Sequence, residues 1–219
     1  MFPIRDTRNS GKFPAINLAL IGFTIYVFIR ELFAPNINLF ITQYGLIPQN
    51  INFADFQTLR SFITSMFLHA GFLHILSNMW FLWIFGDNVE AAIGHIKYLF
   101  FFLFCGIVAS FIQYIFIADS SLPMVGASGA IAGVLGAYLK LFPKNKVDTI
   151  IPIFGLPFII ALPANFMLIY WFITQAFNGV AVVIAETASI GGIAYIAHAG
   201  GFVTGFLICR SLVWQRLDR

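Results

Sequence analysis

Long apolar runs constrain this chain more than any other feature of its sequence. The hydrocarbon core of a bilayer is about 30 Å thick, and an α-helix of roughly 20 residues crosses it. Six runs are predicted as membrane helices: Ala15 to Phe33, Phe62 to Phe85, Tyr98 to Ile117, Ser128 to Phe142, Leu162 to about Ala185, and Gly191 to Val213. A mean hydropathy of +0.89, with 10% charged residues, excludes an ordinary soluble domain. We therefore expect an all-α membrane protein, a six-helix bundle with a short central fourth helix.

Basic residues predict the orientation of these helices, because Lys and Arg near span ends concentrate on the cytoplasmic side. Ten of the 12 basic residues fall on one side: Arg5, Arg8, Lys12, Lys97, Lys140, Lys144, Lys146, Arg210, Arg216 and Arg219. Only Arg30 and Arg60 remain for the other side. We expect a single domain over residues 1–219 in the cell membrane, with short cytoplasmic tails at 1–14 and 214–219. The net charge of +3 follows from this bias and does not indicate nucleic-acid binding.

Three polar residues are predicted to lie at one depth in the membrane. Ser128 lies twelve residues before Lys140, and His198 lies twelve residues before Arg210. At the helical rise of 1.5 Å per residue, both lie about 18 Å from the cytoplasmic boundary. His74, on a span that runs the other way, reaches about the same level. Polar groups at this depth are costly and usually face a functional cavity, so we expect a water-filled pocket open to the outer side.

Small residues predict how Ser128 and His198 could meet. Two predicted helices carry stripes of small residues at helical spacing: Gly129, Gly133 and Gly136 on the fourth, and Ala197, Gly201 and Gly205 on the sixth. Such faces let helix backbones pack closely, and packing these two stripes together would bring the imidazole to the hydroxyl. A simpler alternative is that the glycines only aid helix association and the histidine is a hydrogen-bonded core residue. For the glycines alone we favour this alternative; for Ser128 and His198, which share one depth, we favour catalysis.

The predicted chemistry is that of a serine protease with two catalytic side chains. None of the nine acidic residues falls at the level of His198, which indicates a Ser-His dyad with His198 as general base and later as acid. Ser128 also begins a helix, whose free N–H groups can stabilise an oxyanion. His74 and Asn78, four residues apart, share a helix face and are predicted as side-chain donors to the same oxyanion. For Asn78 taken alone, interhelical hydrogen bonding is an equal alternative.

Four segments in order resemble the rhomboid intramembrane serine proteases: Arg60; His69-Ala70-Gly71-Phe72-Leu73-His74-Ile75-Leu76-Ser77-Asn78; Gly126-Ala127-Ser128-Gly129; and Ala197-His198-Ala199-Gly200-Gly201. The resemblance implies a rhomboid-like fold, with Ser128 as nucleophile and His198 as base. It implies an oxyanion hole made by the Ser128 backbone N–H, His74 and Asn78. It also implies that the substrates are single-span membrane proteins, cut near the outer end of their helix. Structural roles are assigned to His69, Arg60, Glu90, Gly126, Gly129, Gly201 and Gly205; His69 is expected to tie down the first loop and Glu90 to brace loops.

The sequence departs from the family pattern at two positions. Leu59 stands where many members have the Trp of a Trp-Arg pair, and Ala132 stands where some have a Tyr that stacks on the catalytic histidine. The sequence therefore leaves open what orients His198. By the same resemblance, the aromatic residues 170–172 are expected to form a lateral gate for the substrate.

Other functional classes fit less well. A catalytically silent rhomboid relative that binds or escorts membrane proteins should lack Ser128 or His198, and both are present. A transporter should show an acid or base at the midplane and two similar halves, and the sequence shows neither. A zinc protease should carry an HExxH motif, which this sequence lacks. The two cysteines, Cys105 and Cys209, have no metal-binding spacing and are better explained as small buried hydrophobic residues. We expect no metal and no cofactor, and the lipid bilayer and single-span substrates as partners.

Overall fold

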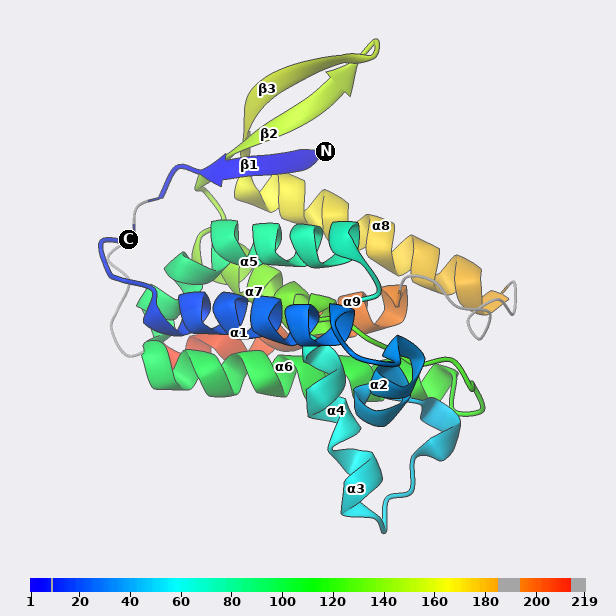
Figure 1. Ribbon diagram of the computed structural model, residues 1–219. Coiled ribbons are helices and arrows are strands. Elements are labelled where there is room, and N and C mark those ends of the chain that lie inside the picture. The colour runs from blue at the N-terminus through cyan, green and yellow to red at the C-terminus, as the bar shows by residue number, and fades with distance from the viewer. Residues whose placement is uncertain (9, 185–193, 214–219) are drawn as a thin grey trace.

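The computed structural model describes residues 1–8, 10–184 and 194–213, and this part of the chain is mostly helical (Figure 1). Its elements follow in the order β1 Phe2–Asp6, α1 Ala15–Leu32, α2 Ile37–Tyr44, η1 Pro48–Asn50, α3 Phe56–Leu59, α4 Ser61–Thr64, η2 Ser65–Phe67, α5 Phe72–Ile93, α6 His95–Phe116, α7 Ser128–Leu141, β2 Lys146–Ile153, β3 Leu156–Pro163, α8 Ala164–Ile184 and α9 Tyr195–Leu212. The predicted end of the fifth span near Ala185, the start of the sixth at Gly191 and the tail at 214–219 lie outside the described residues.

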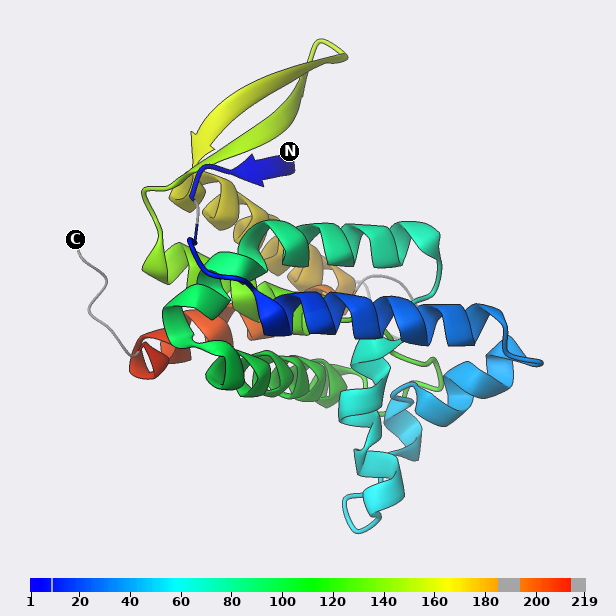
Figure 2. The same cartoon turned by 60° about the vertical axis from the view of Figure 1, so that its left-hand side comes forward.

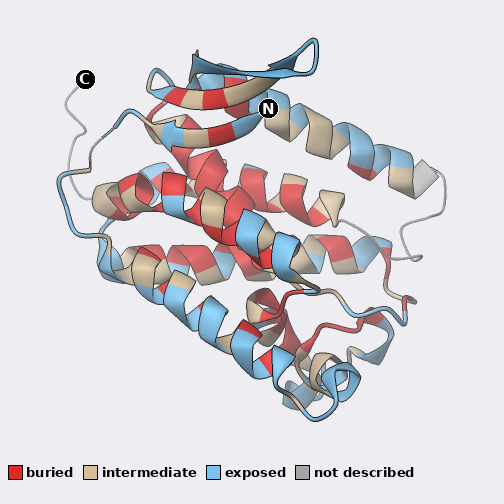
Figure 3. Ribbon diagram, turned by 45° about the horizontal axis from the view of Figure 1, so that its top comes forward, coloured by how far each residue is buried: buried red, intermediate tan, exposed pale blue. Residues whose placement is uncertain are grey.

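Helix α7 lies inside the bundle, and its neighbours cover it on all sides. Every residue from Gly129 to Leu139 is buried, and α7 packs against α5, α6, α8 and α9. Buried positions lie on the inward faces of the helices, whereas exposed positions lie on the outside of the bundle (Figure 3). Many of the exposed side chains are large and apolar, such as Trp83, Phe100 and Leu207. An outer surface of this kind is suited to contact with lipid.

The number of helices that are long and apolar enough to cross a membrane can be compared with the six predicted spans only in part. By length and composition, α1 and α6 could each cross a membrane, and a third span is possible if the bent pair Phe56–Phe67 and Phe72–Ile93 is counted as one. The count of six therefore stays a prediction. The second span does not begin at Phe62 as predicted, because the chain bends by 80° between Phe67 and Phe72. The buried carboxylate of Glu31 accepts the backbone N–H of His69 at 3.1 Å and so satisfies a peptide group that the break leaves without a helical partner.

A three-stranded antiparallel sheet, with strand order β1-β2-β3, corrects the expectation of an all-helical chain. Strands β2 and β3 form a hairpin whose turn residues, Phe154 and Gly155, both have positive φ (51° and 81°), as in the tight two-residue turns that suit hairpins. The apolar run before the predicted fifth span is rich in Ile, which suits a strand as well as a helix. Residues expected as an N-terminal tail form β1. The sheet lies outside the helix bundle, beside the start of α8 and over α5 (Figures 1 and 2).

Asp6, at the end of β1, attaches the sheet to the core helices. Its carboxylate accepts hydrogen bonds from the Tyr138 hydroxyl of α7 at 2.6 Å and from the Asn88 amide of α5 at 2.8 Å. Burial raises the pKa of Asp6 to about 6, because the surrounding protein disfavours the charged carboxylate. An ion pair between Arg5 and Asp148 (2.7 Å) joins β1 to β2. These contacts fix the N-terminal residues against the bundle.

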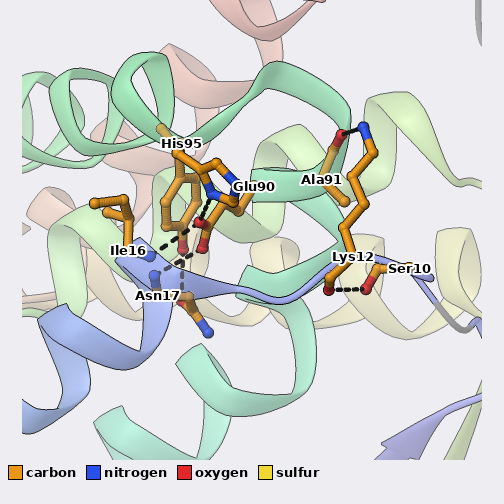
Figure 4. A network of polar contacts seen from close by, with 8 residues as sticks. Ser10, Lys12, Ile16, Asn17, Glu90, Ala91 and His95 are labelled. Carbon is orange, nitrogen blue, oxygen red and sulfur yellow. Dashed lines mark hydrogen bonds and ion pairs between the residues drawn. The ribbon is translucent and has the colours of Figure 1, made fainter.

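Glu90, near the end of α5, caps the start of α1 (Figure 4). Within the described residues α1 has no side-chain cap at its own N-cap position, Pro14. The two carboxylate oxygens of the buried Glu90 accept the N–H groups of Ile16 (2.9 Å) and Asn17 (2.7 Å), and His95 contacts the same carboxylate. Two backbone N–H groups in the first turn of α1, which have no acceptor within the helix, are thereby satisfied. The negative charge of the carboxylate also lies at the positive end of the helix dipole. Glu90 was expected to brace loops; in the structure it instead joins two helices, α5 and α1.

Helices α7 and α9 touch through their backbones. A Cβ atom added at Gly205 would overlap the carbonyl oxygen of Gly133, and one added at Gly201 would overlap that of Gly129. A Cβ at Gly136 would likewise overlap the backbone of α9. The predicted packing of the two glycine stripes is therefore present in the fold.

Replacing Gly205 by Ala should destabilise the protein by about 1–3 kcal/mol, because the two helices must separate to admit the methyl group. Thermal unfolding of the purified protein in detergent micelles measures this effect. Gly22→Ala is the matched control: it lies in α1 with nothing within 4 Å of an added Cβ, and alanine favours the helix. Equal unfolding temperatures for the two variants would contradict the close packing of α7 and α9.

Replacing Glu90 by Gln should also lower stability, by about 1–3 kcal/mol, because an amide keeps one acceptor oxygen and leaves one buried N–H of α1 unsatisfied. Glu31→Gln is the matched control, since its remaining oxygen can still accept the N–H of His69. Urea or thermal unfolding of both variants should show the larger loss for Glu90→Gln. The reverse order would exclude the capping role.

Candidate active site

The structure brings Ser128 and His198 together. Ser128 is the first residue of α7 and His198 is the fourth residue of α9. The Ser128 Oγ lies 2.7 Å from the His198 Nε2, which is hydrogen-bonding distance for a hydroxyl that donates to the imidazole. His198 is buried. The α7–α9 backbone contact described above holds both helices at this separation.

A cavity of about 930 Å³ opens over this pair. Its lining comes from α5, α6, α7, α8 and α9 and from the loop that precedes α7. Ser128, His198, His74 and Asn78 all belong to the lining. The space is large enough for water and for an extended piece of polypeptide beside the hydroxyl.

The loop that leads into Ser128 is fixed by the segment that follows α2. Leu46 and Met124 exchange two backbone hydrogen bonds, of 3.1 and 2.7 Å, as in an isolated antiparallel bridge. The N–H of Gly126 donates to the carbonyl of Ser65 at 2.9 Å. The residues just before the predicted nucleophile are therefore held by backbone bonds to two other segments of the chain.

His74 and Asn78 converge on Gly126. A Cβ added at Gly126 would lie 2.9 Å from the His74 Nε2 and 3.8 Å from the Asn78 Nδ2, and the backbone φ of 123° there also favours glycine. The buried Nδ2 of Asn78 has no hydrogen-bond partner among the described residues. A buried donor without a partner is costly, so this amide is available to donate to an acceptor that enters the cavity. The first turn of α7, which has no capping side chain in the described structure, adds free N–H groups at the same place.

Two residues of α8 contact the imidazole of His198. The Oε1 of Gln175 lies 2.8 Å from Nδ1, on the edge opposite Ser128. Trp171 stacks on the ring, with ring centroids 6.0 Å apart and planes at 27°. Position 132 is an alanine and supplies no aromatic ring, so these contacts answer what holds the imidazole in the described structure. Gln175 was not among the residues predicted from the sequence, although an amide inside an otherwise apolar span is a signal for it.

The structure shows how the residues of the expected gate at 170–172 pack, and the gate itself stays a prediction. Trp171 packs on His198 and Phe202, and Phe172 stacks on Phe202 at 4.8 Å. Only Tyr170 of the three is exposed. Two of these rings therefore fill the contact between α8 and α9 instead of facing outward.

The structure also gives the surroundings of the residues for which structural roles were predicted. His69 does not share a helix with His74 as expected: it precedes α5, and its ring meets that of His74 edge to face at 4.9 Å. The carbonyl of Arg60, between α3 and α4, accepts the N–H groups of Ile63 and Thr64, both at 3.0 Å. A Cβ at Gly129 would lie 2.6 Å from that of Ala109 on α6.

Gln113 is a second amide that the sequence analysis missed. Its buried side chain on α6 accepts the N–H of Ala197 at 3.0 Å, in the first turn of α9. This bond fixes the start of α9 one residue before His198. The signal in the sequence is the same as for Gln175, a polar amide within an apolar span.

Comparison with known proteins agrees with the motifs. Residues 56–215 match a family model described as the Rhomboid domain. The chain is 30% identical over 156 residues to RHOMBOID-like protein 6, mitochondrial, of Arabidopsis thaliana, covering 70% of this chain and 43% of that protein. It is 29% identical over 195 residues to Rhomboid protein 1, mitochondrial, of Saccharomyces cerevisiae (86% and 51%), and 38% identical over 84 residues to Rhomboid protease GluP of Bacillus subtilis (38% and 16%). The chain thus spans about half or less of the length of these relatives. The match over most of its sequence shows that the chain belongs to the rhomboid family of membrane proteins.

Proposed function

We propose that this protein is an intramembrane serine endopeptidase that cleaves single-span membrane proteins with a Ser128–His198 dyad. The observation that carries the proposal is the 2.7 Å contact between the Ser128 Oγ and the His198 Nε2 beside a large cavity. One relative is named as a protease, which agrees with this chemistry. The intact pair argues against the alternative, a catalytically silent rhomboid-like protein that binds or escorts membrane proteins.

The proposed reaction follows from this geometry. His198 Nε2 takes the hydroxyl proton as Ser128 Oγ attacks the carbonyl carbon of the scissile peptide bond. The imidazolium then gives that proton to the departing amine nitrogen as the C–N bond breaks. Water admitted to the cavity then attacks the acyl carbon while it gives a proton to His198 Nε2. The bond from that carbon to Ser128 Oγ breaks, the carboxylic acid product leaves, and His198 returns the proton to Oγ.

The tetrahedral intermediate needs donors for its oxyanion. The Ser128 backbone N–H, the His74 ring and the Asn78 amide are assigned to this role, since the last two converge beside Gly126 just ahead of Ser128. The unpaired Nδ2 of Asn78 is the strongest support, because a substrate oxygen would supply its missing acceptor.

Cleavage of a model single-span protein, reconstituted with the purified enzyme in liposomes, tests the dyad. Ser128→Ala and His198→Ala should each remove activity and leave the fold intact, because each side chain carries a chemical step. Asn78→Ala should lower kcat by about 10²-fold if the amide behaves as an oxyanion donor. Full activity in either dyad variant would exclude the mechanism. An unchanged rate in Asn78→Ala would show that Asn78 is not an oxyanion donor and serves only in helix packing.

A serine-directed phosphonate separates the enzyme from a silent binding protein. Wild-type protein should be labelled covalently, whereas Ser128→Ala should not. Absence of labelling together with absence of cleavage would favour the binding or escort role.

We propose that the protein lies in the cell membrane with both termini cytoplasmic and the cavity open to the outer side, as the basic residues indicate. Two relatives carry mitochondrial names, so the orientation needs its own test. A membrane-impermeant thiol reagent should reach Ser128→Cys from the outer side only and should leave the buried Cys105 and Cys209 unmodified. Labelling from the cytoplasmic side would show that the orientation is inverted.

A further inference from the structure

We propose that Gln175 is a positioning residue for His198, and that the site works as a Gln175–His198–Ser128 relay. In this arrangement the side-chain oxygen of Gln175 accepts the Nδ1–H of the imidazole. This inference rests on the proposed protease function, and it assigns to α8 a part in the chemistry that neither the motifs nor the comparisons provide.

The chemical reason lies in the two tautomers of neutral histidine. Only the form with the proton on Nδ1 leaves Nε2 free to accept the proton of Ser128. The other form would donate from Nε2 to the hydroxyl and could not act as its base. The Oε1 of Gln175, 2.8 Å from Nδ1, is a pure acceptor and therefore selects the first form.

The geometry restrains the ring in two directions. Gln175 and Trp171 are four residues apart on α8 and so share one face of that helix. Trp171 lies on the face of the imidazole, while Gln175 contacts its edge. Thr174 donates to the Trp171 carbonyl at 2.7 Å within the same turn, and α8 packs against α9. A ring restrained at its face and its edge keeps Nε2 directed at Ser128.

A neutral acceptor suits this position better than a carboxylate. An ionised carboxylate at membrane depth carries a large desolvation cost, whereas an amide needs only a hydrogen-bond partner. Gln175 is half-buried, and its bond to His198 provides that partner. The amide therefore supplies orientation and tautomer selection without a buried charge.

Kinetics of the full-length enzyme in liposomes test the relay. Gln175→Leu should lower kcat about 10- to 100-fold with little change in KM, as expected when a catalytic group is misplaced and substrate binding is unaffected. Asn178→Leu, an exposed amide on the same helix, is the matched control and should leave kcat unchanged. Gln175→Glu should restore most of kcat and move the acidic limb of the kcat–pH profile upward, because a carboxylate favours the imidazolium. His74 of α5 and Tyr195 of α9, titratable neighbours of His198, are unchanged in these variants.

A second readout does not depend on activity or on turnover by the variant. NMR of the imidazole nitrogens is measured on the Ser128→Ala protein, and the His198 signals are assigned as those that disappear when His198→Ala is added. These signals should show the tautomer with the proton on Nδ1. Adding Gln175→Leu to the Ser128→Ala protein should remove the preference for this tautomer. An unchanged kcat in folded Gln175→Leu, or an unchanged tautomer, would overturn the relay. In that case cleavage by wild type and its loss in Ser128→Ala would still support the protease itself, so the two proposals fail separately.

Discussion

The backbone contact between α7 and α9 is the constraint on which the candidate site depends. Side chains larger than hydrogen at Gly201 or Gly205 would overlap carbonyl oxygens of α7, so the glycines set the distance between the two helices. Ser128 and His198 lie at corresponding levels on this pair, and their 2.7 Å contact follows from that separation. No hydrophobic force between helices favours such an approach inside lipid, where close packing and hydrogen bonds stabilise it.

The rest of the site is arranged around that contact by hydrogen bonds from other helices. Gln113 of α6 fixes the first turn of α9, and Gln175 of α8 contacts the imidazole. The loop into Ser128 is held by Leu46 and Ser65. Each of these bonds satisfies a group that would otherwise be buried without a partner, so the same interactions stabilise the fold and shape the cavity.

Sequence reasoning predicted the parts of the site that depend on depth and helical spacing, but neither Gln175 nor the sheet. Distances along the chain from Lys140 and Arg210 placed Ser128 and His198 at one level, and the glycine stripes indicated which faces meet. Gln175 could not be placed in this way, because the rotation of an apolar helix decides whether its single amide meets lipid, a neighbour or a cavity. An apolar run rich in Ile can form a strand or a membrane helix, and periodicity does not separate the two. The pairing of β1 with β2 joins residues far apart in the chain, for which one sequence holds no local signal.

Two of the chain's carboxylates lie far from the cavity, whereas that of Glu31 accepts the N–H of His69 just before α5. The carboxylates of Glu90 and Asp6 lie at the end of α5 remote from the cavity, where they accept backbone or side-chain hydrogen bonds. The neutral amides of Asn78 and Gln113 line the cavity, and that of Gln175 contacts the cavity-lining His198. A neutral amide loses less free energy on leaving water than a carboxylate and still has a direction, since one end accepts and the other donates. Under the proposed function, neutral amides of this kind orient the base and supply an oxyanion donor, so that charge arises at the site during the reaction and disappears when the reaction ends.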